Sequence, residues 1–191
     1  KYTVAVKDSE GQAMSASYTM KVVTNNGLQG IDVSAYQGTI DWKQVKNSGV
    51  DFAMIRVLTG KMGALSVDSQ FYKNIKNAKQ NGIKVGVYRY GYAMTVEEAQ
   101  REANMVVEAL KNSGCSLDFP VAYDVEDEAT QGTLSKQELV NVINAFRDVI
   151  EANGDEFMIY GNLNWLNNKI PMEEFKDVDV ENAYHYAMQF I

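Results

Sequence analysis

Asp124 and Glu126 close a short apolar run that opens at Pro120. Side chains two apart in a β-strand point to the same face, so in a strand these two acids stand side by side with Cα atoms roughly 6.5 Å apart. Such a pair supports proton transfer, because burial and mutual repulsion push neighbouring carboxyl pKa values apart. The alternative is a solvated charged loop, since Asp127 and Glu128 follow directly.

Strand-like segments alternate with helix-like segments from Leu28 onward. The strand segments are short apolar runs, and the helix segments show apolar residues three or four apart and end at or near a glycine. We expect strands over residues 30–33, 51–57, 83–88, 120–126 and 157–160.

Capping residues mark where the four intervening helices begin. We expect a Gly-containing loop over residues 59–67 and an irregular segment over 162–191. The expected caps are Asp41 and Asp68 for the first two helices, and the capping boxes Thr95 with Glu98 and Ser135 with Glu138 for the other two.

Repeated strand–helix units indicate a parallel sheet with helices outside it. The crossovers are right-handed, so the sheet is either doubly wound or closed into a barrel, and both place ligands at the carboxyl ends of the strands. Asp32 lies near the end of the first strand, and Asp124 and Glu126 close the fourth. The side chains at or near the ends of the second, third and fifth strands are Arg56, Tyr88, Tyr90 and Tyr160.

Three carboxylates and several aromatic side chains around one opening favour sugar chemistry. Glycoside hydrolysis needs a protonated carboxyl for the leaving oxygen and a second group that stabilises or traps the oxocarbenium-like centre. Tyrosine and tryptophan stack on sugar faces and donate hydrogen bonds from their polar ends. A carboxylate cluster could instead bind Mg²⁺ or Ca²⁺, but no EF-hand loop is present and Asp-x-Glu alone is a weak signal.

The composition excludes several other classes of protein. The 191 residues suffice for one sizeable domain, and the net charge of -7 disfavours a nucleic-acid partner. The single cysteine, Cys115, excludes an internal disulfide, and the single histidine, His185, cannot build a metal cluster. The sequence has no membrane span and no signal peptide, and it starts at Lys1, so we expect a segment of a longer protein.

Residues 1–27 have a different pattern from the rest of the chain. Residues 2–6 and 17–23 alternate with period two around a turn at residues 8–11, which predicts a β-hairpin. A hairpin is too short to hold a core of its own. We expect residues 1–27 to be the tail and linker of a preceding β module, with an edge hairpin of the main domain as the alternative, and residues 28–191 to form the main domain.

Residues 30–42, with the sequence GIDVSAYQGTIDW, closely resemble the opening of the glycoside hydrolase family 25 lysozymes, the N-acetylmuramidases of bacterial and phage endolysins. Residues 52–56, 68–82, 86–90 and 120–126 are similar to the same family in the same order, so the resemblance covers about residues 28–165. It implies an α/β fold, a modified TIM-like (β/α)5β3 barrel. It also implies cleavage of the β-1,4 bond between N-acetylmuramic acid and N-acetylglucosamine in peptidoglycan glycan strands. We expect a secreted or cell-surface monomer without cofactor or metal.

The resemblance also implies roles for individual residues. Glu126 would be the general acid, and Asp124 would be the nucleophile or would orient the substrate's acetamido group if that group attacks. Asp32 would sit beside them and tune their charge and hydrogen bonding. The sequence leaves both routes open. The implied sugar-contacting residues are Gln37, Arg56, Tyr88, Tyr90, Tyr160 and Trp165.

Two features depart from the family pattern. Arg89 stands where many members have histidine, and arginine cannot shuttle protons at neutral pH. The family also continues after the fifth strand with further strands, a Gly-rich stretch and a late Asp. Residues 177–180 and 184–190 resemble compressed fragments of that region, so we expect the C-terminal part of the domain to be truncated or gapped.

Two competing hypotheses follow from these observations. The same barrel could hold cell-wall glycan without cutting it, as a non-catalytic binding module. A metal-dependent hydrolase or deacetylase is the weaker hypothesis, because catalytic zinc sites rely on several histidines.

Overall fold

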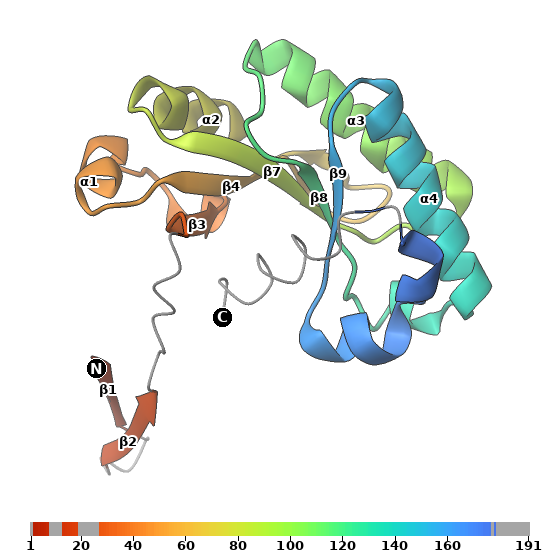
Figure 1. Cartoon of the computed structure of the whole chain (residues 1–191), viewed down its shortest axis with the longest axis horizontal. Helices are drawn as coiled ribbons and strands as arrows, with labels where there is room; N and C mark the ends of the chain where they lie inside the picture. Colours follow the sequence, from red (N-terminus) through yellow and green to blue (C-terminus); the bar gives the residue numbers. More distant parts are fainter. Residues whose placement is uncertain (1, 8–12, 19–26, 177, 179–191) are drawn as a thin grey trace.

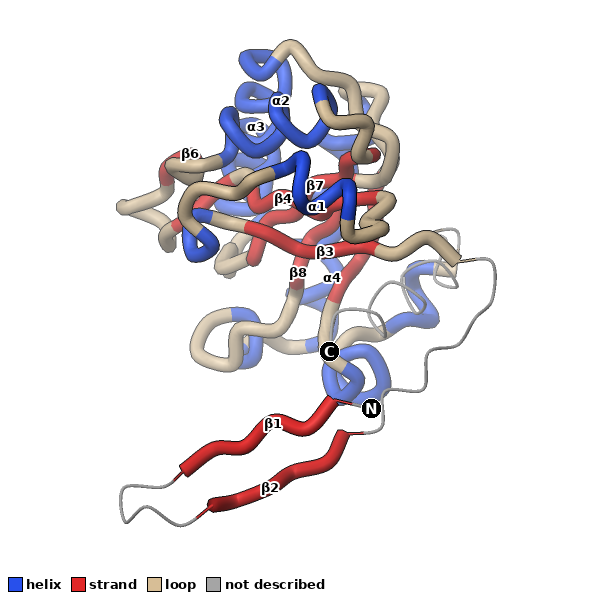
Figure 2. The backbone as a smooth tube through the Cα atoms, turned by 90° about the vertical axis from the view of Figure 1, so that its left-hand side faces the viewer, coloured by secondary structure: helices blue, strands red, loops and turns tan. Residues whose placement is uncertain are grey.

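A computed structural model of the chain describes residues 2–7, 13–18, 27–176 and 178. His185 and the segments 179–180 and 184–190, which the sequence analysis singled out, lie outside these residues. Strands β1 (Tyr2–Lys7) and β2 (Ala13–Tyr18) form an antiparallel pair with Tyr2 opposite Tyr18 (Figure 2). The hairpin prediction is therefore confirmed, but the second strand starts earlier than the expected residue 17.

The described part of the main domain is built on a five-stranded parallel sheet with the order β3-β4-β7-β8-β9 (Figure 1). The strand order follows the chain without the reversal that a doubly wound sheet requires, so the sheet winds in one direction. The strands are β3 (Gly30–Val33), β4 (Phe52–Arg56), β7 (Lys84–Tyr90), β8 (Val121–Asp124) and β9 (Phe157–Tyr160).

Helices cover one face of this sheet (Figure 1). Their apolar stripes, which include Ile75, Val106 and Ile143, join Val87 and Ile159 of the strands in one fully buried core. The amphipathic spacing read from the sequence thus points each stripe at the sheet. The helices are α1 (Trp42–Asn47), α2 (Phe71–Gln80), α3 (Val96–Ser113) and α4 (Lys136–Ala152).

The opposite face of the sheet carries a second, smaller apolar cluster. Phe52, Met54, Ala122 and Met158 are at most 3% exposed and pack together. They alternate along the strands with the helix-facing side chains, as the period of two requires. A sheet buried on both faces explains why the strands read as nearly continuous apolar runs.

Two of the expected helix caps are confirmed. The Asp41 carboxylate accepts the backbone N–H groups of Lys43 and Gln44 at the start of α1. Ser135 and Glu138 form a reciprocal capping box at the start of α4. In both cases the donors lie within three residues of the acceptor, so local sequence suffices to predict the contact.

Two other caps differ from expectation. Thr95 accepts the Glu98 N–H as predicted, but the Glu98 carboxylate accepts the N–H of Met94 and not that of Thr95. Asp68 is not the capping residue of α2, because Gln70 holds that position. The Asp68 side chain is buried, and its Oδ1 accepts the N–H of Gln70 beside the start of α2. Its Oδ2 is bonded to distant residues, which the sequence pattern could not reveal.

Several short elements fall in segments read as loops. Residues 59–67 were expected to be a loop, but β5 (Leu58–Thr59) and β6 (Ser66–Val67) pair there as a small antiparallel sheet. Short turns of helix follow β3, β8 and β9. They are η1 (Ala35–Gln37), η2 (Gln131–Thr133), the π-helix η3 (Trp165–Lys169) and η4 (Met172–Phe175). Within the described ranges, no helix is both long and apolar enough to cross a bilayer.

Candidate active site

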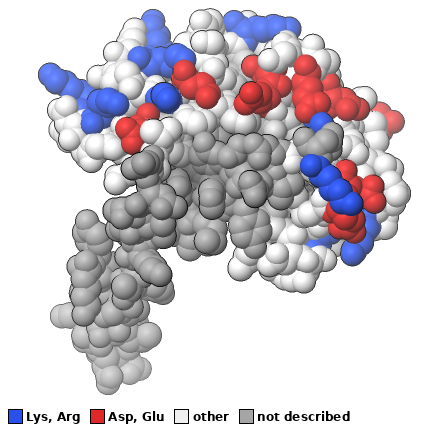
Figure 3. Space-filling model, viewed as in Figure 1, with Lys and Arg blue, Asp and Glu red and all other residues white. Residues whose placement is uncertain are grey.

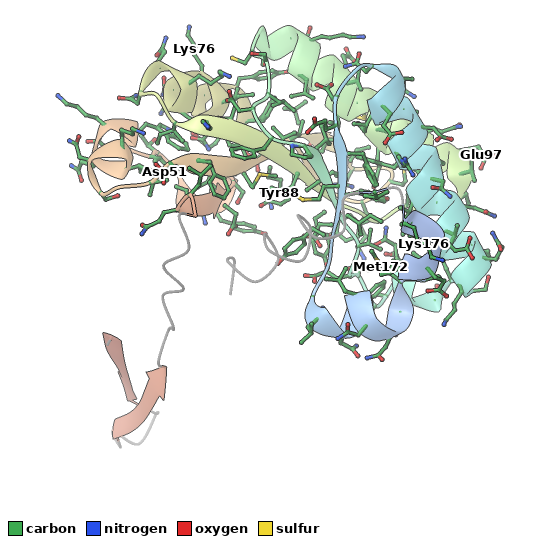
Figure 4. The ribbon with its side chains drawn as sticks, in the orientation of Figure 1. Asp51, Lys76, Tyr88, Glu97, Met172 and Lys176 are labelled. Carbon is green, nitrogen blue, oxygen red and sulfur yellow. The ribbon has the colours of Figure 1, made fainter. Side chains whose placement is uncertain are left out.

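The sheet register brings the predicted side chains to one end of the strands. Tyr90, Asp124 and Tyr160 are paired across β7, β8 and β9, and Arg56 and Tyr88 pair two positions earlier. Residues two apart share a face, so this group lies on the side away from α2–α4, where Figure 4 labels Tyr88. A cavity of about 430 Å³ opens there, and its lining includes Asp32, Gln37, Arg56, Tyr88, Tyr90, Asp124, Glu126 and Tyr160.

Asp124, the last residue of β8, is the most buried carboxylate of the cavity at 7% exposure. Its Oδ1 is buried and accepts no hydrogen bond from the described residues. Burial raises the pKa of Asp124 well above its ordinary value, and the negative charges of Glu126 and Asp32 raise it further. Asp124 therefore holds a proton more strongly than an exposed aspartate does.

Glu126 lies in the loop beyond β8, because the strand ends two residues earlier than expected. The N–H of Val125 still bonds the Tyr160 carbonyl at 2.8 Å, which carries the strand pairing one residue further. The Glu126 Oε2 accepts the backbone N–H of Asn162, also at 2.8 Å. The loop after β9 thus fixes the side chain of Glu126, and both acids of the Asp-x-Glu pair line the same cavity.

Asp32 in β3 supplies the third carboxylate of the cavity and remains exposed to solvent. Partial burial raises the pKa of its carboxyl, and a backbone hydrogen bond offsets part of that rise. Among the described residues, no group of three or more His, Cys, Asp and Glu side chains has an arrangement that could hold a metal ion. Glu126 and Asp32 lie near enough to Asp124 to raise its pKa, although the three acids do not form such a cluster.

Tyr88, Tyr90 and Tyr160 of the cavity stay protonated at neutral pH. Burial raises the pKa of Tyr160 to about 12, and the charges of Asp124, Glu126 and Asp32 contribute. Burial also raises the pKa of Tyr88 and Tyr90 above the ordinary value of 10, each with a further contribution from Asp124. Protonated phenols at these positions can donate hydrogen bonds to sugar hydroxyls and amides.

Two of the predicted sugar contacts are engaged with neighbouring residues. Arg56 bonds Asp68 Oδ2 through Nε at 2.8 Å and Nη2 at 2.7 Å. The Gln37 Oε1 accepts the N–H of Ser34 at 2.7 Å and closes a capping box around η1. Both side chains line the cavity, and their bonds to neighbouring residues hold them in the cavity wall.

Trp165 is the one predicted site residue that the structure does not bring to the cavity. It is 1% exposed and packs in the main core, and its indole N–H donates to Glu128 Oε1 at 3.0 Å. It is absent from the described residues that line the cavity.

Sequence reasoning missed two aromatic side chains of the lining, Tyr36 and Tyr92. Tyr92 continues the period-two series of Tyr88 and Tyr90, and its ring centroid lies 5.1 Å from that of Tyr90. The series itself was the available signal, because alternate residues at a strand end share a face. Tyr36 stands in the opening motif, but it lies beyond the end of β3 and no strand pattern indicates it.

Arg89, the departure from the family pattern, also borders the cavity, but its side chain is fully buried. Its Nη2 lies 2.6 Å from Glu102 Oε1 of α3 and donates to the Gly60 carbonyl at 2.8 Å. Its charge is thus paired with Glu102, away from the three acids.

Comparisons with known proteins identify the family and the fold. The model of the family described as Glycosyl hydrolases family 25 matches residues 31–189. The autolytic lysozyme of Clostridium acetobutylicum is 31% identical over 144 residues, which cover 75% of this chain and 41% of that protein. The chain spans about half or less of the curated relatives it matches first.

Solved structures show the same fold. The modular autolysin LytC of Streptococcus pneumoniae is 24% identical with a TM-score of 0.66, and the match covers 86% of this chain and 43% of that one. A family 25 glycosyl hydrolase of Bacillus anthracis is 20% identical with a TM-score of 0.62, and the match covers 82% of this chain and 72% of that one. At these identities the likeness concerns the α/β fold with its mostly parallel sheet.

Proposed function

Because the chain belongs to glycosyl hydrolase family 25, we propose that it hydrolyses peptidoglycan at the β-1,4 bond between N-acetylmuramic acid and N-acetylglucosamine. The observation that carries the proposal is that Asp32, Asp124 and Glu126 line one cavity at the carboxyl ends of parallel strands. The similarity to the Clostridium protein, an autolytic lysozyme, supports the same activity. The binding-only alternative is not favoured, since the acids that hydrolysis needs are present together.

We propose that residues 28–191 form the catalytic domain as a modified TIM-like (β/α)5β3 barrel. The one-directional strand order and the helices on one face support this geometry. We propose residues 1–27 as the tail of a preceding β module, since β1 and β2 pair with each other in a separate two-stranded sheet.

Glu126 is the proposed general acid. Its Oε2 is engaged with the Asn162 N–H, so we assign the transferable proton to Oε1. That proton would pass to the glycosidic oxygen as the bond to the leaving sugar breaks. The half-exposed loop position of Glu126 leaves the carboxyl accessible to a bound chain.

Asp124 is proposed to act on the opposite side of the reaction, as the nucleophile or as the group that orients the acetamido nitrogen when the acetamido oxygen attacks. Its burial at the end of β8 fixes it within the cavity. Asp32 raises the pKa of Asp124 through its negative charge, which supports a role in tuning that carboxyl. Both routes use the same three side chains.

We propose sugar contacts for the cavity residues Gln37, Arg56, Tyr88, Tyr90 and Tyr160. We do not retain Trp165 in this role, since its buried indole is bonded to Glu128. The proposed partner is the glycan strand of peptidoglycan, reached by a monomer that is secreted or held at the cell surface. No cofactor is needed for this carboxylate chemistry.

Loss of turbidity of a peptidoglycan suspension tests the proposal. The unmodified chain should clear the suspension, and Glu126→Gln should lower the rate at least about 100-fold, because a general acid contributes roughly 10²–10⁴. The matched control is Glu97→Gln, an exposed glutamate at the start of α3 that Figure 4 shows far from Tyr88. Clearing by Glu126→Gln at the control rate would contradict the acid role. If the unmodified chain and both variants bind the suspension and none of the three clears it, the binding-only alternative replaces hydrolysis.

A further inference from the structure

Among residues 27–176, Tyr36 is the most exposed large aromatic or apolar side chain, at 87%, and it lines the cavity. An aromatic ring exposed to water normally adopts several rotamers, and its exposed apolar surface contributes no hydrophobic free energy to folding. Here the backbone and the ring are both held in place, which calls for a physical reason.

Polar contacts from three side chains fix the turn that carries Tyr36. The Tyr36 N–H donates to Ser34 Oγ at 3.2 Å, and the Ser34 N–H donates to Gln37 Oε1 at 2.7 Å. The Ala35 N–H donates to Asp68 Oδ2 at 3.0 Å, which anchors η1 to a residue 33 positions away. The turn is therefore preorganised and does not move freely with its exposed side chain.

The ring of Tyr36 is supported on one side by a positive charge. The Arg56 guanidinium carbon lies over the ring, 4.9 Å from its centroid, in the range of a cation–π contact. Arg56 is itself held by two bonds to Asp68, whose side chain is fully buried. One buried carboxylate thus positions both the backbone before Tyr36 and the cation behind its ring.

We propose that Tyr36 is the stacking platform of an outer glycan subsite, and that it binds the apolar C–H face of an N-acetylhexosamine ring at the rim of the cavity. Asp68 is the positioning residue of this subsite and acts through Ala35 and Arg56. The solvent-facing side of the ring is open to a sugar, while the cation holds the other side. The inference rests on the proposed function for the identity of the glycan.

Binding of a defined oligosaccharide tests the subsite. We would measure the Kd of N-acetylglucosamine tetrasaccharide by calorimetry in the Glu126→Gln background, so that hydrolysis does not consume the probe. Tyr36→Ala should weaken binding about three- to tenfold, the range that a single aromatic contact supplies. Tyr36→Phe, which keeps the ring and removes the hydroxyl, should bind as the parent does.

Tyr72→Ala is the matched control, because Tyr72 is an exposed tyrosine of α2 outside the cavity lining. Equal affinities for Tyr36→Ala and Tyr72→Ala would overturn the proposal, and so would a parent that does not bind the tetrasaccharide. Tyr36 is largely exposed, so its replacement should leave the thermal unfolding midpoint close to that of the parent.

A double-mutant cycle tests the part assigned to Asp68. Asp68→Asn should weaken tetrasaccharide binding more in the presence of Tyr36 than when Tyr36→Ala is already present, because part of its effect passes through the Tyr36 contact. The loss that remains in Tyr36→Ala is the part that passes through Arg56, itself a proposed sugar contact. Additive losses would show that Asp68 does not act through Tyr36.

Kinetics separate this subsite from the hydrolytic activity. On peptidoglycan, Tyr36→Ala should raise KM with kcat nearly unchanged, since a remote stacking contact is made equally before and during the reaction. If Tyr36→Ala cleaves peptidoglycan with an unchanged KM and binds the tetrasaccharide with an unchanged Kd, the hydrolase proposal is supported and the subsite proposal is contradicted. If Tyr36→Ala weakens tetrasaccharide binding but the unmodified chain cleaves no peptidoglycan, the subsite is supported and the proposed hydrolase activity is contradicted.

Discussion

Asp124 is deeply buried and has two negatively charged neighbours, and both features affect its pKa. The causes of its raised pKa are burial first, then the charge of Glu126, then that of Asp32. Removing one charge should therefore shift the titration of Asp124 without moving the strand that carries it.

The first test of this coupling is Asp32→Asn. If Asp124 acts in its ionised form, the acidic limb of the kcat/KM profile follows its pKa. The substitution removes one of the charges that raise that pKa, so the acidic limb should move to lower pH. Asp148→Asn, at an exposed position of α4, is the control and should leave the profile in place. A shift to higher pH would contradict the arrangement.

The second test is the pH dependence of folding stability. The folded protein binds the Asp124 proton more tightly than the unfolded chain does, so this group stabilises the fold fully below the ordinary pKa of 3.8 and loses that contribution as pH rises through the raised value. The amide side chain of the Asp124→Asn variant cannot ionise. The free energy of unfolding of this variant, measured in urea, should gain on that of the unmodified protein as pH rises from 4 to 7. A constant difference would show that Asp124 is not perturbed by burial.

Residue types and spacing were enough to find the three carboxylates and most of the tyrosines. Asp124 and Glu126 close a recognisable apolar run and are two residues apart. Tyr88 and Tyr90 are also two residues apart, at the end of another apolar run. Tyr36 was not predicted to line the cavity, and Asp68 was predicted only as a helix cap, because Asp68 meets Ala35 and Arg56 only after the chain folds. Contacts between distant residues leave no local pattern in one sequence.

One buried ion pair connects several of the helices and strands that support the cavity. Arg89 of β7 and Glu102 of α3 are both fully buried and 2.6 Å apart. The Tyr123 hydroxyl of β8 donates to Glu102 Oε2 at 3.1 Å, and the N–H of Tyr92 donates to Oε1 at 3.2 Å. Arg89 adds a bond to the Gly60 carbonyl beside β5. The pair therefore connects α3 to three segments that line or support the cavity.

Breaking this pair should destabilise the protein strongly. Glu102→Gln leaves Arg89 as an unpaired buried charge, which costs about 3–5 kcal/mol of unfolding free energy. Chemical denaturation at neutral pH measures the loss. The control is Glu151→Gln, which breaks the partly exposed Arg147–Glu151 pair of α4 and should cost less than about 1 kcal/mol. Similar losses for the two variants would mean that the buried pair contributes no more than a surface pair.

Element types followed from the sequence more reliably than element ends. The strands and helices occur in the predicted order because apolar spacing, caps and terminal glycines agree with each other along most of the chain. β5 and β6 were missed because strands of two residues have no period to detect. β8 ends at residue 124 and not at residue 126, and Glu126 lines the cavity from the loop beyond the strand.

Charge is distributed unevenly over the whole molecule. The chain carries a net charge of -7, and on the face shown in Figure 3 Asp and Glu side chains are more frequent toward α3 and α4, while Lys and Arg side chains are more frequent toward α1 and α2. The overall charge gives no general attraction to an anionic cell wall, so we expect the affinity to come from hydrogen bonds and stacking or from other modules of the protein. The fold class could be predicted from alternating strands and helices, but the single direction of the strand order required the structure.

Chemical analysis of the new chain ends in digested peptidoglycan tests the central claim most directly. Purified peptidoglycan would be incubated with the unmodified chain, Glu126→Gln or Glu97→Gln, reduced with borohydride and examined by mass spectrometry. We predict reduced N-acetylmuramic acid ends with the unmodified chain and Glu97→Gln, and almost none with Glu126→Gln. Reduced N-acetylglucosamine ends, released peptides without glycan cleavage, or equal cleavage by Glu126→Gln would contradict the assignment of this cavity as a muramidase site.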